Sequence, residues 1–322
     1  MEYILNESAY KTTNGFKINN IKVDINIPQI TYDNKHTITK KITSKIGLTF
    51  DKYDEYKYTL DNDITETIEY SNSIGRVINI IVDTNDNNKH EFNLILKSLD
   101  DTECFSYIKI DTNLNNKNIT INVINLLNNK TNSFIAYNTK VDNISRLMIN
   151  HIDLGGYYCI NNLYSEVYDD SLSRINTIYY GNNNVLDYNY HIKTIGKRGI
   201  ANIITEGLLE NHAYKQHKGI IDFIEGCTHS EGIEKENCVL LDDTSISRSC
   251  PMLMCHEEDV EGEHGVSTGK IDDDKLFYLM SRGLDELSAK KLIIQANFGS
   301  ILYYIKSEEV KNMVYDYLDK IF

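Results

Sequence analysis

The sequence predicts a mainly β protein, a parallel β-helix followed by a small C-terminal helical domain. From residue 76 to about residue 260, short runs rich in Ile, Val and Tyr alternate with Asn, Asp and Gly turns. Helical periodicity is confined to the end of the chain, and only two prolines occur, which suits a continuous hydrogen-bonded ladder. Strand spacing alone leaves a sandwich, a barrel and a solenoid open. Asn and Gly at turns that need left-handed backbone favour the solenoid.

The order of the elements suggests three parts. Residues 1–60 mix short alternating runs, such as 21–27, with polar turns, and we expect an irregular cap there. Residues 61–271 form the predicted β-helix core, and residues 272–322 form the helical domain. The clearest strand-like runs of the core are 77–82, 92–96, 107–110, 119–126, 175–180, 219–224 and 238–241.

Three amphipathic helices are predicted after residue 271. Asp272 or Asp273 can cap the first helix, and Gly283 can end it in the left-handed conformation. Asp285 caps the second helix, and Ser307 starts the third. Such helices mostly pack on their own domain, so periodicity alone does not indicate a docking role.

Composition and charge exclude some classes of function. A chain of 322 residues buries a sizeable core without disulfides. The net charge of -14 argues against nucleic acid or an anionic membrane as a partner, because both need a basic face. We recognise no signal peptide, no membrane-spanning run and no GxxxxGK[ST] phosphate loop, so we expect a cytoplasmic protein that binds no nucleotide itself.

The six cysteines are expected to be free, metal-bound or redox-active in a reducing compartment. Cys104 and Cys159 lie in ordinary strand contexts and are expected in the core. Cys227 and Cys250 are separated by about one solenoid turn, which would place them on neighbouring turns. The cysteines that gather toward the end of the strands are candidate iron or sulfur sites: Cys227, Cys238, Cys250 and Cys255.

The segment 250–283, CPMLMCHEEDVEGEHGVSTGKIDDDKLFYLMSRG, combines thiols, carboxylates and a histidine with a helix start. Thiolates hold iron in clusters, and imidazole or carboxylate can replace one of them. If the strand is regular, Cys255 and Glu257 point to the same side. The acids of 257–263 are most simply a solvated turn, although they would also favour a bound cation.

Three phrases in this region resemble the closing part of the SufB/SufD family of iron–sulfur cluster assembly scaffolds. They are residues 251–260, the Glu263-His264-Gly265 triplet and the run 274–284 with its LFYLMSRGL motif. The resemblance is strong from about residue 217 to residue 298. It implies a right-handed parallel β-helix whose C-terminal helices dock a SufC-like ABC ATPase. It further implies a non-enzymatic scaffold for a transient cluster of the four-iron type, with a sulfur donor and apoprotein acceptors as partners.

The chain is shorter than the usual SufB and resembles compact single-subunit scaffolds, which implies a homodimer. His264 matches the histidine of the family's His-Gly phrase. Gly265 stands where SufB carries a glutamate, so that role would pass to Glu263, Glu257 or Glu261. Cys238 lies nearest to the scaffold cysteine of SufB. The resemblance thus implies Cys238, Cys250, Cys255 and His264 as candidate iron ligands.

Two other classes of function were weighed. A polysaccharide-active β-helix enzyme would use paired acids in a groove, but such enzymes are normally secreted and lack a helical tail. A zinc-stabilised interaction protein is the alternative to the scaffold, although its ligands lack the close CxxC pairs of common zinc sites. Those ligands would be Cys227, His229, Cys238 and Cys250.

Overall fold

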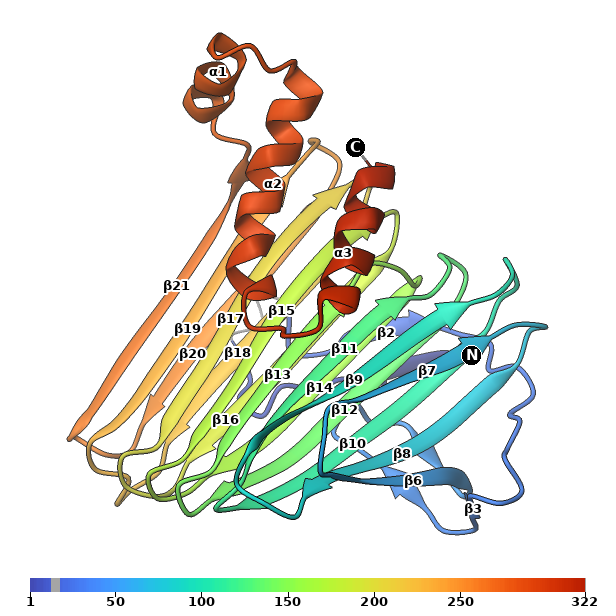
Figure 1. Cartoon of the computed structure of the whole chain (residues 1–322), viewed down its shortest axis with the longest axis vertical. Helices are drawn as coiled ribbons and strands as arrows, with labels where there is room; N and C mark the ends of the chain where they lie inside the picture. Colours follow the sequence, from blue (N-terminus) through green and yellow to red (C-terminus); the bar gives the residue numbers. More distant parts are fainter. Residues whose placement is uncertain (13–17, 322) are drawn as a thin grey trace.

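The computed structural model describes residues 1–12 and 18–321, and these form a parallel β-solenoid with three helices near the C-terminal end (Figure 1). The chain alternates between a nine-stranded and an eight-stranded sheet, so that each turn of the solenoid places one strand in each. Strands of successive turns pair parallel and in register. The predicted parallel β-helix with C-terminal helices is therefore confirmed, and the sandwich and barrel alternatives are wrong.

The strands are long and regular. The nine-stranded sheet contains β3 (Thr37–Ile38), β6 (Tyr53–Leu60), β8 (Gly75–Thr84), β10 (Phe105–Asn115), β12 (Asn132–Asp142), β14 (Tyr158–Val167), β16 (Val185–Thr194), β18 (Tyr214–Phe223) and β20 (Ile246–Cys255). The eight-stranded sheet contains β7 (Ile64–Tyr70), β9 (Lys89–Ser98), β11 (Asn118–Leu126), β13 (Arg146–Asp153), β15 (Leu172–Asn182), β17 (Ile200–Glu210), β19 (Ser230–Leu240) and β21 (Val260–Lys270). Two antiparallel pairs near the N-terminus join β1 (Glu2–Leu5) to β2 (Ile21–Asp24) and β4 (Ile42–Thr43) to β5 (Thr49–Phe50).

Asparagines make the corners of the solenoid. Asn116, Asn143, Asn183 and Asn211 each lie between two strands with φ values of 54°, 53°, 52° and 53°. Asparagine tolerates this left-handed conformation better than most residues with a side chain. Asparagines therefore occupy left-handed positions at the corners, as the sequence predicted for a solenoid.

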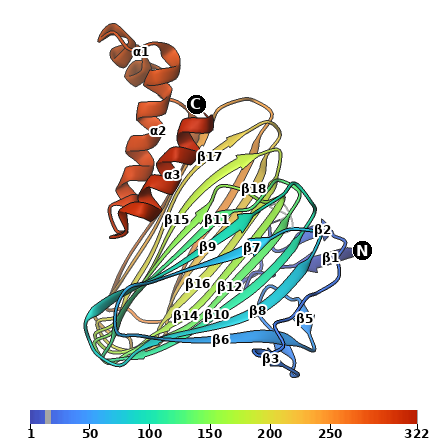
Figure 2. The ribbon, with the colours of Figure 1, turned by 45° about the vertical axis from the view of Figure 1, so that its right-hand side comes forward.

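Most strands are buried on both faces because each sheet is covered on the outside as well. In β11, Ile121 and Val123 enter the inner core between the sheets, whereas Ile124 enters an outer cluster with Phe298 and Val314 of the helices. On the opposite side, the N-terminal residues form another outer cluster over the nine-stranded sheet. Figure 2 shows the helices and the N-terminal strands on opposite sides of the solenoid.

The parallel ladder begins earlier than the boundary expected at residue 61. Strand β6 (Tyr53–Leu60) already pairs parallel with β8, so part of the expected cap belongs to the first turn. The rest of residues 1–60 that the structure describes contributes short antiparallel pairs and the outer cluster. No helix among the described residues is long and apolar enough to cross a membrane.

The predicted helix signals are confirmed. Helix α1 (Asp273–Ser281) begins after Asp272, whose carboxylate accepts hydrogen bonds from the backbone N–H groups of Asp274 and Lys275. Asp285 likewise caps α2 (Glu286–Leu302), and the Ser307 hydroxyl accepts the Val310 N–H at the start of α3 (Glu308–Ile321). Gly283 follows α1 with a φ of 100°, as a left-handed stop requires.

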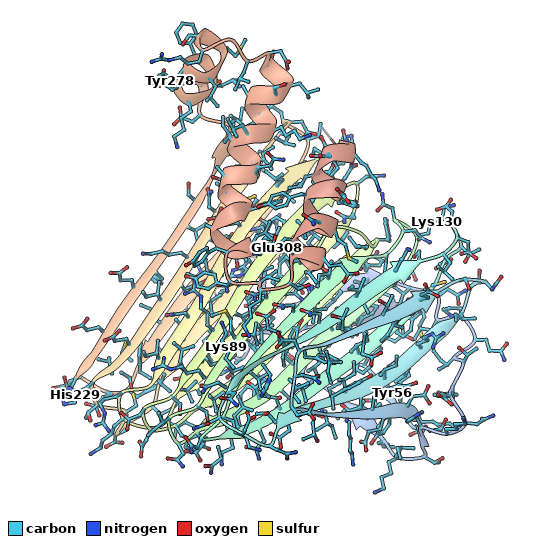
Figure 3. All side chains as sticks on the ribbon, viewed as in Figure 1. Tyr56, Lys89, Lys130, His229, Tyr278 and Glu308 are labelled. Carbon is cyan, nitrogen blue, oxygen red and sulfur yellow. The ribbon has the colours of Figure 1, made fainter. Side chains whose placement is uncertain are left out.

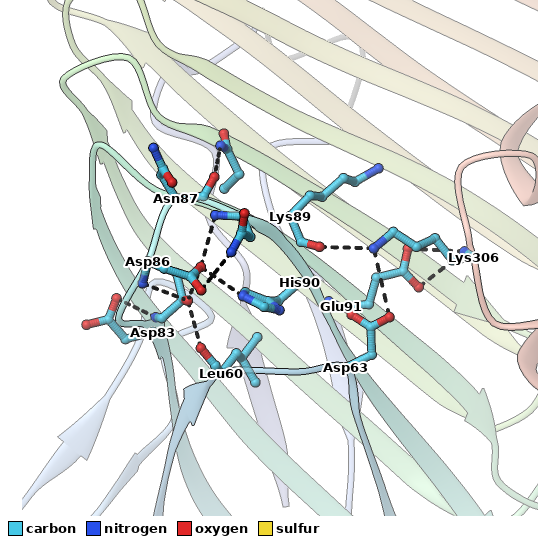
Figure 4. Close-up of polar contacts among 12 residues, drawn as sticks. Leu60, Asp63, Asp83, Asp86, Asn87, Lys89, His90, Glu91 and Lys306 are labelled. Atoms are coloured by element: carbon cyan, nitrogen blue, oxygen red, sulfur yellow. Dashed lines mark hydrogen bonds and ion pairs between the residues drawn. The ribbon is translucent and has the colours of Figure 1, made fainter.

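The connection between α2 and α3 is anchored to the solenoid by a buried carboxylate (Figure 4). Glu91 of β9 is 1% exposed, and its two carboxylate oxygens accept the backbone N–H of Lys306 at 3.1 and 3.2 Å. The Lys306 ammonium donates to the carbonyl of Lys89 at 3.0 Å. Burial raises the pKa of Glu91, so the carboxylate is held there against a desolvation cost.

A ladder of buried asparagine amides continues from this anchor across the eight-stranded sheet. The Asn122 amide donates to Asn93, Asn150 donates to Asn122, and Asn176 donates to Asn150, each at 2.7 Å. Arg174 donates to Asn176 and stacks 4.3 Å from the ring centre of Tyr304. The helix connection therefore contacts both ends of the ladder.

Replacing the anchor should loosen the helical domain. We expect Glu91→Ala to lower the free energy of unfolding by about 1–3 kcal/mol, because the Lys306 N–H loses its acceptor. The exposed Glu69 of β7 is the matched control, and Glu69→Ala should change stability by less than about 0.5 kcal/mol. Denaturant unfolding measures both values, and equal losses for the two variants would contradict the anchor role.

Candidate functional site

The last turn of the solenoid is its open end. In the described part of the chain, β20 and β21 stand at the ends of their sheets, next to β18 and β19. Strand β21 is exposed from Glu261 to Lys270, and β20 is partly exposed along its length. These strands therefore present backbone edges and an uncovered inner face, as terminal strands do.

The strand register decides which candidate residues face the interior. Leu253 of β20 and Val260 of β21 pack on the inner core, and side chains alternate along a strand. His264 therefore also faces inward, and it lies in register with Glu234 of β19. Cys238 shares this inner face, since it lies four positions after Glu234 in the same strand.

Beneath the last turn lies a cluster of fully buried polar residues, which we call the polar chamber: Lys215, His217, Glu234, Glu236 and Cys238. Lys215 forms an ion pair with Glu236 and donates to the Ser249 hydroxyl of the last turn at 2.9 Å. His217 Nδ1 lies 3.5 Å from Glu236 Oε2 and 3.7 Å from Glu234 Oε1. Strands β18 and β19 thus direct a group of polar side chains into the interior, which also holds a buried pair, His151 with Asp153 at 2.9 Å, farther from the open end.

Burial sets the protonation states of the chamber. It raises the pKa of Glu234 to about 9, with a further contribution from the negative charge of Glu236. Burial also lowers the pKa of His217 to about 4. At neutral pH Glu234 is therefore a neutral acid and His217 a neutral imidazole. Burial opposes the ionisation of Glu236 too, but the Lys215 ammonium holds the pKa of Glu236 below the ordinary value.

The chamber has unused hydrogen-bonding capacity. His217 Nδ1, both carboxyl oxygens of Glu234 and Glu236 Oε2 have no hydrogen-bond partner among the described residues. Gly219 makes room for Glu234, because a Cβ at this position would lie 2.0 Å from Glu234 Oε1. Buried polar atoms without partners generally indicate space for water, an ion or a ligand.

The Cys238 thiol lies at one side of the chamber and is 1% exposed. Burial raises its pKa, whereas the charge of Lys215 and the neighbouring hydroxyls of Tyr179 and Ser247 act in the opposite direction. Gly207 lies in register between Tyr179 and Cys238, and its missing side chain leaves space for the Tyr179 ring. The thiol therefore has polar neighbours from three turns of the solenoid.

Cys250 and Cys255 are on different faces of β20. Cys250 lies in register with Lys218, whose side chain contacts Asp187 on the outer face of the nine-stranded sheet. Alternation therefore directs Cys250 outward. Cys255 is the last residue of β20 and is exposed. One chain does not bring the predicted iron ligands together, and the described residues hold no group of three or more His, Cys, Asp or Glu side chains placed to bind a metal ion.

Cys227 and Cys250 lie on neighbouring turns of the solenoid but not side by side. Cys227 lies in the corner after β18, where its sulfur accepts the Thr194 hydroxyl at 3.7 Å, and Cys250 pairs with Lys218 instead. Tyr214 pairs with Ile246, so one turn takes 32 residues here, more than the 23 positions between the two cysteines. With Cys227 at a corner and Cys250 on an outer face, the zinc-site alternative has no support.

The expected pairing of Cys255 with Glu257 also fails, because β20 ends at Cys255. Glu257 lies in the next turn and accepts the backbone N–H of Gly226 at 3.0 Å, which is a structural role. Glu263 is exposed on β21 and pairs with Lys235 at 3.1 Å.

Cys104 and Cys159 are buried in the inner core, as predicted. The sequence reasoning missed four members of the chamber: Lys215, His217, Glu234 and Glu236. A signal was present, because both KQH in β18 and EKE in β19 place polar residues at alternate, inward positions of strands.

A known protein family matches most of the solenoid and part of the helical domain. The family model described as SUF system FeS cluster assembly, SufBD core domain, matches residues 78–297, which extend from β8 into α2 and include the chamber, Cys238 and His264. The chain belongs to this family. The resemblance noted in the sequence is thereby confirmed at the level of the SufBD family.

Curated relatives carry the same family names. The chain is 25% identical over 125 residues to the iron-sulfur cluster assembly protein SufD of Bacillus subtilis, covering 39% of this chain and 29% of that protein. It is 29% identical over 96 residues to SufD of Escherichia coli, covering 30% and 23%. A SufBD family protein of Mycobacterium bovis is 34% identical over 85 residues, covering 26% and 21%. The match spans less than a third of the length of these relatives.

The buried acid of the chamber should make stability depend on pH. Because the folded state raises the pKa of Glu234 from 4.5 to about 9, its contribution to stability is present at low pH and is lost as pH rises between these values. We expect Glu234→Gln to gain stability relative to the unchanged protein as pH rises from about 5 to 8, by a few kcal/mol. Thermal unfolding across this range measures the difference.

The exposed Glu263 supplies the control for this measurement. Glu263→Gln should leave the pH dependence of Tm unchanged. A Glu234→Gln protein whose Tm follows pH in parallel with the unchanged protein would contradict the neutral buried acid.

Proposed function

We propose that the chain is a scaffold subunit of a SUF-type iron–sulfur cluster assembly complex. The observation that carries this proposal is the polar chamber with Cys238 and His264 on the inner face of an open solenoid end, within the segment matched by the SufBD family. The printed names of the relatives, iron-sulfur cluster assembly protein SufD among them, support the same role. In this role the chain is a non-enzymatic carrier of iron and sulfide.

The residues of the chamber have the chemistry that this cargo needs. Thiolate, imidazole and carboxylate are all ligands of iron, and a cysteine carries sulfur as a persulfide. In the proposal Cys238 carries sulfur, and Cys238 and His264 bind iron as the substrate of assembly. Cys250 and Cys255 remain candidate ligands that a second copy of the chain could supply. The product is a transient cluster, proposed to be of the four-iron type, for delivery to apoproteins.

We propose a homodimer formed through the open end. Strands β20 and β21 offer unpaired edges, and their exposed surfaces include Ile246 at 48% and Val266 at 39% exposure. Edge-to-edge pairing would satisfy the free backbone groups and cover these side chains. It would also place two copies of His264 near one interface.

An ABC-type ATPase is the proposed partner of the helical domain. Helix α1 buries none of its residues against the described part of the chain, and Figure 3 shows Tyr278 on this helix, well away from the solenoid. Phe277 is 74% exposed and Tyr278 56% exposed, beside a hollow lined by Leu279 and Leu292. Exposed aromatic side chains around an apolar hollow favour a protein partner. ATP hydrolysis on that partner would then move the anchored helices.

Anaerobic reconstitution with iron and sulfide tests the site. We expect Cys238→Ser to lower cluster content at least fivefold, because a serine oxygen is a poor ligand of iron in clusters. Cys104→Ala, in the same inner core but outside the chamber, should retain the cluster. Full cluster content in Cys238→Ser, measured by visible absorption and iron analysis, would contradict the assignment of Cys238.

Co-purification tests the docking surface. When the chain is produced together with a SufC-like ATPase, we expect Phe277→Ala with Tyr278→Ala to abolish the complex, because two exposed anchors are removed. Tyr303, 82% exposed just after α2, provides a matched control, and Tyr303→Ala should keep the partner bound. A partner that stays bound to the double variant would refute docking at α1.

A further inference from the structure

Two buried lysines lie close together on β18, and their surroundings differ. Lys218 faces outward, where it pairs with Asp187 at 2.7 Å and donates to the carbonyl of Asn6 at 3.0 Å. It thereby fixes the N-terminal segment on the nine-stranded sheet. Lys215 faces inward, is 0% exposed, and contacts no N-terminal residue in the hydrogen bonds of the described chain. A buried ammonium is costly, so its place in the chamber calls for an explanation.

Lys215 and Cys238 both face the interior of the solenoid, from the consecutive strands β18 and β19. The partners of Lys215 are Glu236 and Ser249, and its ammonium lies 5.8 Å from the ring centre of Tyr179. The Tyr179 hydroxyl donates to Glu236 Oε1 at 3.4 Å. The hydroxyl of Ser247, which is in register with Lys215, lies 3.5 Å from the hydroxyl of Thr268, which is in register with Cys238, so the rows of Lys215 and Cys238 face each other across the interior.

The same arrangement leaves Cys238 between one positive and one negative group. Lys215 favours negative charge on the sulfur, and Glu236 opposes it. The other titratable members of the chamber, Glu234 and His217, are neutral around pH 7. Lys215 is therefore the cation of the chamber that can balance a charged sulfur atom.

We infer that Lys215 is a positioning residue that stabilises negatively charged sulfur on Cys238, first as the thiolate and then as the perthiolate. This inference rests on the proposed function and names the group that lets a buried cysteine carry sulfur. The thiolate attacks the terminal sulfur of a persulfide or polysulfide donor. A new S–S bond forms at Cys238 and the S–S bond of the donor breaks. The departing donor thiolate takes the proton of the transferred sulfur and leaves as a thiol, so Cys238 carries a perthiolate and atoms, charge and electrons balance.

The physical basis is the cost of an unpaired charge in a closed interior. A thiolate inside the solenoid cannot recover its hydration, and charge-assisted hydrogen bonds are worth about 1.5–3 kcal/mol each. The negative charge moves to the terminal sulfur after transfer, so the counter-charge is needed before and after the step. Removing it should shift the sulfur equilibrium away from Cys238.

Sulfur exchange at equilibrium tests the inference. The protein is incubated anaerobically with inorganic polysulfide and a series of glutathione concentrations, and mass spectrometry reports the fraction of Cys238 that carries sulfur. We expect Lys215→Met to need about tenfold less glutathione for half removal of the sulfur. Lys215→Arg should restore much of the loss, because it keeps the charge. Glu236→Gln should act in the opposite direction and retain sulfur more strongly.

Lys218→Met is the matched control, because it also removes a buried, ion-paired lysine from β18, on the other face. It should leave the exchange midpoint of Cys238 unchanged even if it lowers stability. An unchanged midpoint in Lys215→Met, or an equal shift in Lys218→Met, would overturn the inference. If Lys215→Met does not fold, Glu236→Gln provides the test. A glutathione midpoint for this variant that is unchanged, or shifted toward sulfur loss, overturns the inference.

The outcome separates this inference from the proposed function. Cys238 that takes up sulfur in the unchanged protein but ignores the Lys215 and Glu236 substitutions refutes the positioning role alone. Cys238 that takes up no sulfur in the unchanged protein, together with full cluster content in Cys238→Ser, refutes the sulfur role of the site itself.

Discussion

The parallel register between successive turns is the constraint on which the rest of the structure depends. Each strand satisfies its backbone groups through the turn before it and the turn after it, so side chains at equivalent positions stack in rows. Tyr179, Gly207, Cys238 and Thr268 form one such row. The ladder ends at β20 and β21, where the row is open to whatever binds there.

The same register explains why polar chemistry can exist inside the solenoid. Most of the remaining interior is filled by stacked Ile, Val, Leu and Tyr, and a lone charge there would be very costly. Lys215 and Glu236 are buried as a pair, and Glu234 is kept neutral. These groups lie one turn below the open end, next to the exposed strands β20 and β21. Apolar burial in the other turns offsets the desolvation cost of the polar chamber, which would not be stable by itself.

The helical domain is joined to this framework through a small number of polar contacts. Glu91 holds the connection between α2 and α3, and Arg174 contacts Tyr304 at the other end of the asparagine ladder. Helix α1 extends beyond the covered area. A partner bound to α1 would therefore pull on helices that are fixed to the eight-stranded sheet, and this sheet ends in β21.

Local signals could be predicted from the sequence, and long-range ones could not. Asp272 and Asp285 were predicted as helix caps because a cap depends on the next three residues. The inward position of His264 depends on the register of β21 against β19, which corner lengths decide. Cys227 shows the difficulty, since it lies in such a corner and not in a strand. The chamber was missed because its members come from two sheets and only their stacking brings them together.

We propose that iron and sulfur are assembled on the inner face of the last turns, around Cys238 and His264. Pulsed electron paramagnetic resonance of the reduced, reconstituted cluster in protein labelled with nitrogen-15 histidine tests it most directly. We expect a nitrogen hyperfine coupling in the unchanged protein that disappears in His264→Gln. A cluster without nitrogen coupling, formed equally well in His264→Gln, would contradict it.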